Sequence, residues 1–148
     1  MAGFTNLAET DWLDLLLTNV AFPNIGDAAG LPPSVAAGVF TLALNAADAI
    51  TDASTVLSDN EVAYTGYTRP TVARSVSAWT VTGDTASNDN LIQFGEMSAG
   101  GPDTVTDVSM GFATGSVMQI FGQVTVDLVI NNGVNPQLAV SALDITAD

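Results

Sequence analysis

The stretch that decides the fold reads Val117-Met-Gln-Ile-Phe-Gly-Gln-Val-Thr-Val-Asp-Leu-Val-Ile130, and Asn131-Asn-Gly133 follows it. Polar residues such as Gln123 and Asp127 interrupt this apolar run, so it is too short and too polar to cross a bilayer. Its β-branched and aromatic side chains are typical of a β-strand. The Asn-Asn-Gly sequence is a strong turn signal. The stretch therefore predicts a strand that ends in a tight turn.

Similar signals occur on both sides of this strand. Residues 83–90 are expected to form a turn, and residues 45–58 fit either a short helix or an exposed loop. In the last expected strand the alternation of apolar side chains changes parity near Ser141 and Ala142, which predicts a β-bulge there. Short strands at close spacing are typical of a sandwich or jelly roll. The other expected strands cover residues 39–44, 71–76, 78–81, 91–94, 105–110 and 138–145.

One segment near the start has helical periodicity. Asn6 and Glu9 have the spacing of a capping box, with Asn in place of the usual Ser or Thr. Apolar residues from Trp12 to Val20 cover a wide face, and Pro23 is expected to end the helix. We predict a helix over about residues 6–21. Its apolar face either packs on the protein's own sheet, which we favour, or forms a docking surface for a partner.

Length and pattern together predict one domain. The chain has 148 residues, which suits a single core, and no linker divides it. We expect a mainly β fold: a single-domain, jelly-roll-like β-sandwich over about residues 39–146 with an N-terminal α-helix.

The residue inventory excludes most catalytic chemistry. The chain contains no His and no Cys, and its two cations are both Arg. A Ser-His-Asp triad, a thiolate nucleophile and a Schiff-base lysine are therefore impossible. Residues 84–90 offer several oxygen ligands that suit calcium, but their spacing differs from an EF-hand and favours a polar turn. We predict no enzymatic activity, no metal and no cofactor, and a pair of carboxylates for glycan cleavage is a weak third alternative.

The charge balance restricts the partners. Sixteen acidic residues face two cations, which gives a formal net charge of -14. We therefore expect no nucleic-acid partner and no binding to anionic membranes. Each of Arg69 and Arg74 is expected to meet a carboxylate, either within the chain or across an interface. Tyr64, Tyr67 and Arg69 are close enough in sequence to share a patch. That patch either pins a strand edge through a Tyr–Arg–Asp network, which we slightly favour, or makes an intersubunit contact.

Three motifs carry a resemblance. They are Phe40-Thr-Leu-Ala-Leu44, then Glu61-Val62 leading to Gly66-Tyr-Thr-Arg69, and then Trp79-Thr-Val-Thr-Gly-Asp-Thr-Ala-Ser-Asn88. In this order, before a β-rich C-terminal part, they resemble a family of small bacteriophage virion proteins often labelled tail fibre proteins. The resemblance implies a jelly-roll-like sandwich with a structural task. Several small jelly-roll phage proteins are capsid decoration, or cement, proteins.

From this resemblance we expect a structural virion protein. The favoured hypothesis is a decoration protein on the capsid exterior, which binds the major capsid protein and stabilises neighbouring capsomers. The alternative is a tail or tail-fibre component that binds the host surface or joins tail parts. A homo-oligomer is expected, with a trimer favoured. The candidate interface residues are Phe4, Trp12, Ile25, Tyr67, Arg69 and Arg74.

Overall fold

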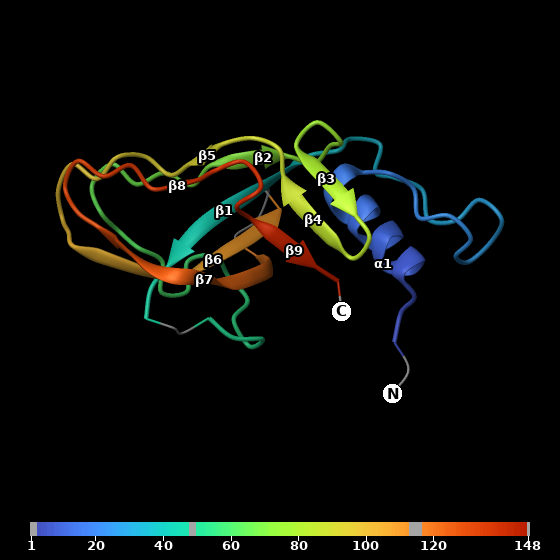
Figure 1. The fold of residues 1–148 in the computed structure, drawn as a ribbon, viewed down its shortest axis with the longest axis horizontal. Coiled ribbons are helices and arrows are strands. Elements are labelled where there is room, and N and C mark those ends of the chain that lie inside the picture. The colour runs from blue at the N-terminus through green and yellow to red at the C-terminus, as the bar shows by residue number, and fades with distance from the viewer. Residues whose placement is uncertain (1–2, 48–49, 113–116, 148) are drawn as a thin grey trace. The chain divides into compact units, whose positions relative to one another are not determined.

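The computed structural model describes residues 3–47, 50–112 and 117–147 (Figure 1). The fold is mainly β, with antiparallel sheets and one N-terminal helix, as the sequence predicts, and it is consistent with a β-sandwich. The chain divides into two compact units, each built from separate stretches. Unit 1 combines Met1–Gly38, Ala73–Leu91 and Leu138–Asp148, and unit 2 combines Val39–Val72 with Ile92–Gln137. The single domain and the jelly-roll connection stay predictions.

The helix of unit 1 begins at the expected residue, but its cap differs from the expected one. Helix α1 spans Asn6–Leu13 and continues into a π-helical turn, Asp14–Thr18. Its N-cap is Thr5, whose hydroxyl accepts a hydrogen bond from the Ala8 amide at 3.4 Å. The predicted cap at Asn6 is wrong, because Thr5 has the extended backbone that a cap needs and Asn6 is already helical. Asn19 ends the helical segment with a left-handed φ of 61°, before Pro23 is reached.

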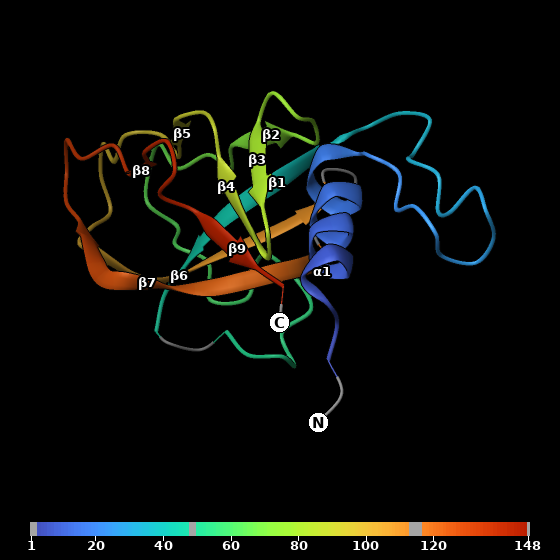
Figure 2. The ribbon, with the colours of Figure 1, turned by 45° about the vertical axis from the view of Figure 1, so that its right-hand side comes forward.

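Helix α1 packs on strands of its own unit. Figure 2 shows it beside β3 (Trp79–Thr82) and β4 (Thr85–Asn88). Leu13 and Leu17 are buried, and the Thr10 hydroxyl donates to the Gly83 carbonyl at 2.6 Å. These contacts agree with the favoured interpretation of the apolar face.

The sheet of unit 1 has the order β3-β4-β9, and β9 spans Asp144–Thr146. The predicted turn over residues 83–90 is correct only at its start, because residues 85–88 form β4. The predicted strand over residues 138–145 is also wrong. Its two ends belong to β8 (Gln137–Leu138) and β9, and a turn lies between them, closed by the Ala142 amide on the Ala139 carbonyl at 3.1 Å. The change of parity near Ser141, which has a φ of 57°, marks this turn rather than a bulge.

Unit 2 contains a four-stranded sheet of order β2-β1-β6-β7 (Figure 1). All the contacts between these strands are antiparallel where their register is defined: Leu42 of β1 faces Met110 of β6, and Ser109 of β6 faces Phe121 of β7. The predicted strands at 39–44, 105–110 and 117–130 are confirmed, whereas β2 is shorter than expected. The strand bounds are β1 Val39–Asn45, β2 Thr71–Ala73, β6 Asp103–Phe112 and β7 Met118–Ile130.

One face of this sheet is covered by the segment that the sequence left open. Ile50 and Leu57 are buried against Ala43 and Met118. Asn45 ends β1, and the described part of residues 46–58 forms an irregular covering loop; residues 48–49 lie outside the described residues. A second, small sheet pairs β5 (Ile92–Gln93) with β8.

Candidate functional site

The outer edge of β1 is closed by loop backbone. The Leu42 amide donates to the Pro70 carbonyl at 3.0 Å, where β2 begins. Farther along, the Val62 amide donates to the Leu44 carbonyl at 3.0 Å, and the Ala46 amide donates to the Asn60 carbonyl at 2.8 Å. The amide of Leu44 lies between these contacts, and none of the three provides it with an acceptor. It therefore needs another hydrogen-bond partner.

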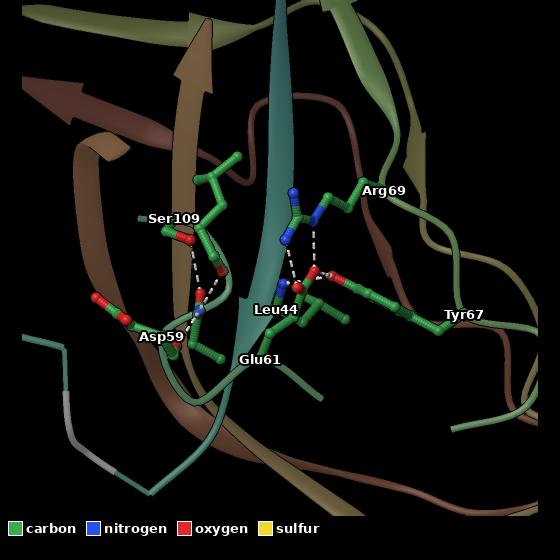
Figure 3. A network of polar contacts seen from close by, with 8 residues as sticks. Leu44, Asp59, Glu61, Tyr67, Arg69 and Ser109 are labelled. Carbon is green, nitrogen blue, oxygen red and sulfur yellow. Dashed lines mark hydrogen bonds and ion pairs between the residues drawn. The ribbon is translucent and has the colours of Figure 1, made fainter. Parts of the chain in front are cut away.

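Tyr67 supplies that partner. Its hydroxyl accepts a hydrogen bond from the Leu44 amide at 3.0 Å and donates to Glu61 Oε1 at 2.8 Å (Figure 3). The ring of Tyr67 packs edge-on against Tyr64, with centroids 5.3 Å apart, and lies parallel to Phe94 at 6.5 Å. Burial is the main cause that raises the pKa of Tyr67, so its hydroxyl remains a donor at neutral pH.

Arg69 completes the network from the other side of Glu61. Its Nε lies 2.6 Å from Oε1 and its Nη2 lies 2.5 Å from Oε2 of the same carboxylate (Figure 3). This two-point, charge-assisted contact is strong and directional. The hydrogen bond to Glu61 raises the pKa of Arg69, so its guanidinium stays charged over the physiological range.

The predicted tyrosine–arginine network that pins a strand edge is therefore confirmed, with Glu61 as its acid instead of an aspartate. Tyr64 is in the same aromatic group, but its hydroxyl donates to the Gly95 carbonyl at 3.0 Å. The intersubunit role proposed for this patch stays a prediction.

A second buried network fixes the covering loop to the sheet. The Asn45 amide nitrogen donates to the carbonyls of Leu57 and Asp59, at 3.1 and 2.8 Å, and its oxygen accepts from the Ser109 hydroxyl at 2.7 Å (Figure 3). Asp107 lies opposite Asn45 in the register and is buried. Its Oδ2 accepts from the Thr106 hydroxyl at 2.8 Å, and its Oδ1 has no hydrogen-bond partner in the described parts of the chain.

Arg74 acts inside unit 1. Its Nε donates to the Leu16 carbonyl at 2.6 Å, its Nη2 donates to the Leu15 carbonyl, and its Nη1 donates to the Ser34 hydroxyl at 2.9 Å. The expected carboxylate partner is not found among the described residues. A cation at the C-terminal end of a helix satisfies carbonyls that the helix leaves unpaired. The side chain is only 8% exposed, and burial lowers its pKa.

The candidate interface residues fall into both units, and their interface role stays a prediction. Phe4 and Trp12 are exposed in unit 1, and Trp12 contacts the ring of Phe22 edge-on at 5.4 Å. Ile25 is half-buried in a loop that the paired backbones of Phe22 and Leu31 close. In unit 2, Tyr67 and Arg69 are half-buried in the network around Glu61.

The polar segment 84–90 is organised around one amide. Asn88 is fully buried; its nitrogen donates to the carbonyls of Asn90 and Ala139, both at 2.8 Å. Its oxygen accepts from the amides of Ala142 and Leu143, at 3.1 and 2.9 Å. Both donors and both acceptor positions are therefore used within unit 1. Over residues 3–47, 50–112 and 117–147, no group of acidic side chains is arranged to hold a metal ion.

Comparison with known proteins shows the family to which this chain belongs. A family model described as "Podophage GP4 fiber I protein gp80" matches residues 3–146. The chain belongs to this family. It is therefore a structural component of a phage virion, which confirms the resemblance found in the sequence. No curated protein matches the chain. Within the described residues, no helix is both long and apolar enough to pass through a bilayer.

Sequence reasoning identified Tyr67 and Arg69 of this family member but missed three residues that organise its polar networks. Glu61 and Asn88 were noticed only as parts of motifs, Asn88 also lay in the segment weighed as a calcium site or a polar turn, and Asn45 lay in a segment without a role. Asn45 and Asn88 each stand at the end of a run of residues that favour strands. An Asn in that position could have indicated a polar network, because a buried amide needs several hydrogen-bond partners.

Proposed function

We propose that this protein is a non-enzymatic fibre component of a podophage virion. The observation that carries the proposal is the family match over residues 3–146, which spans both units. Nearly the whole described chain thus corresponds to a family whose description is a fibre protein. The fibre role was the alternative in the sequence analysis, and the family description now favours it over the decoration role.

The polar chemistry of the chain supports a structural task. Both cations are used to hold the fold together: Arg69 binds Glu61, and Arg74 binds the end of the helical segment. The chain has no Lys, His or Cys with which to build a reactive group. Its net charge of -14 gives the protein an acidic surface, which disfavours non-specific association between its copies.

Separation of virions into heads and tails tests the fibre role. The chain is quantified in each fraction by mass spectrometry, with the major capsid protein as the internal reference. A fibre protein remains with the tail fraction in a low ratio to the capsid protein. Recovery with the heads, in a ratio near that of the capsid protein, would refute the fibre role and favour the decoration protein that binds the major capsid protein.

A further inference from the structure

A long loop of unit 1, residues 19–38, contains no helix and only isolated bridge residues. Figures 1 and 2 both show it extending past helix α1, away from β3 and β4. Loops longer than about 12–15 residues are uncommon in compact domains and are usually either functional or disordered. The contacts within this loop decide between the two.

Paired hydrogen bonds hold the loop at two levels. The Phe22 amide donates to the Leu31 carbonyl at 3.0 Å, and the Leu31 amide donates to the Phe22 carbonyl at 2.8 Å. The Asn19 side chain donates to the Ser34 carbonyl at 3.0 Å and accepts from the Ser34 amide at 2.9 Å. Arg74 also donates to the Ser34 hydroxyl, at 2.9 Å. A loop fixed at these points is ordered before a partner binds, which lowers the entropy cost of binding.

Two prolines lie between these fixed points. Pro32 and Pro33 follow Leu31 directly, and Ser34 comes next. A proline fixes its own φ at about −65°, and it drives the residue before it into an extended conformation. Leu31 and Pro32 each precede a proline, so the stretch from Leu31 to Pro33 has the character of a polyproline II helix.

The side chains of this stretch face solvent. Leu31 is 38% exposed, Val35 is fully exposed, and Pro32 and Pro33 are exposed as well. In the part of the chain that the structure describes, the carbonyls of the two prolines accept no hydrogen bond. Proline-rich segments of this kind bind grooves lined with aromatic side chains. Trp and Tyr suit such a groove, because each adds a hydrogen-bond donor that can reach a free carbonyl.

The charges of the chain indicate what surrounds that groove. Over residues 15–47 the only charge among the described side chains belongs to Asp27, so the loop fits an apolar groove. The rest of the chain is acidic, with a net charge of -14, and its two cations are used within the fold, Arg69 in an ion pair and Arg74 at the helix end. A partner with cations beside its groove is therefore complementary to this protein.

We propose that Leu31–Val35 is a docking segment, which inserts its proline pair into an aromatic groove, flanked by cations, on another protein of the same virion. The aromatic rings pack on the two prolines, and their donors bind the free proline carbonyls. The inference goes beyond the fibre role. It requires a neighbouring protein in the virion, whether the chain lies on a fibre or on the head.

Incorporation of variants into virions tests the docking segment. A phage that lacks the gene is grown on a host that supplies the full chain, and the chain is quantified against the major capsid protein by mass spectrometry. The double variant Pro32→Ala/Pro33→Ala is expected to lower incorporation about tenfold or more, with a melting curve like that of the wild type. Pro23→Ala removes an exposed proline from the same loop and is expected to be incorporated normally. Equal incorporation of the two variants would overturn the proposal.

Photo-cross-linking in intact virions tests the groove without changing the prolines. A benzophenone amino acid is introduced at Val35, and the peptides that it links are sequenced by mass spectrometry. We expect a peptide of a second virion protein that contains Trp or Tyr, with Lys or Arg nearby. The same probe at Val76, which is 69% exposed in unit 1, is the control and is expected to leave that peptide unlinked. The proposal is overturned if Val35 links only to copies of this chain, to a peptide without aromatic residues, or to nothing, or if both positions link the same peptide.

Discussion

Replacement of Asn88 by aspartate tests how the C-terminal segment of unit 1 is held. The side chain is fully buried, and it donates to two carbonyls and accepts from two amides. Asn88→Asp keeps the shape but replaces the donor nitrogen by an oxygen. The carbonyls of Asn90 and Ala139, each 2.8 Å away, then face a carboxylate. Both partly buried carbonyls lose their donor, and the new carboxylate stands where the Asn88 side chain is fully buried.

The size of the effect follows from those two carbonyls and from the buried charge. Loss of the donor at each partly buried carbonyl costs about 1 kcal/mol, and the buried carboxylate beside them adds a desolvation cost of a similar or larger size, so the substitution costs roughly 2–6 kcal/mol. For a chain of this length, that lowers the melting temperature by roughly 5–20 °C. Thermal and urea unfolding, followed by circular dichroism, measure the change. Asn90→Asp is the matched control: its side chain is exposed and donates only to the Ser77 carbonyl at 3.0 Å, so we expect a loss below about 1 kcal/mol.

Calcium binding by residues 84–90 is the alternative that would contradict the structural role of Asn88. If residues 84–90 were a calcium site, a new carboxylate at position 88 would strengthen it. Wild-type stability in Asn88→Asp, together with a calcium-dependent rise in its melting temperature, would refute the structural role of the amide. We expect the same loss of stability with calcium and with a chelator.

Three further substitutions test the other networks. Glu61→Gln removes the charged acceptor of Arg69 and is expected to cost about 1–2 kcal/mol in urea unfolding, because the pair is only partly buried; a loss no larger than that of the exposed Glu96→Gln would contradict this. Burial raises the pKa of Tyr67, so the unfolded chain releases this proton near pH 10 while the folded chain keeps it. Stability that is present below pH ~10 therefore falls as the pH rises above it, and Tyr67→Phe should flatten this fall in urea titrations at alkaline pH; an unchanged slope would be evidence against it. Arg74→Met leaves the helix-end carbonyls unpaired and is expected to cost about 2–4 kcal/mol and to speed amide exchange in the last helical turn; unchanged exchange there would count against the role of Arg74.

The sequence predicted those elements whose signal is local. Apolar, β-branched runs predicted β1, β6 and β7, because such side chains are enriched in strands and the runs are long enough to give a clear signal. The pairing of Arg69 with an acid was predictable because a cation in an acidic chain attracts a counter-charge. The same reasoning failed for Arg74, which binds the carbonyls at the end of the helical segment. The identity of that acid as Glu61 depended on how the chain folds back along β1, which no local pattern records.

The elements that failed depended on contacts made far along the chain. Asn88 looks like a turn residue, yet it is buried because residues 139–143 fold around its side chain. The same contacts divide the expected last strand into β8 and β9. At the helix start, Thr5 and Asn6 are both good caps, and the choice between them is made by one residue's backbone angle.

Gold labelling of intact virions tests the central claim most directly. A single cysteine is introduced at Val126, which is exposed and lies in a chain without other thiols, and virions that carry the variant are labelled with maleimide gold and imaged. We predict gold on the fibres with bare capsid faces. Gold spread evenly over the head would contradict the fibre role and would identify the chain as a decoration protein.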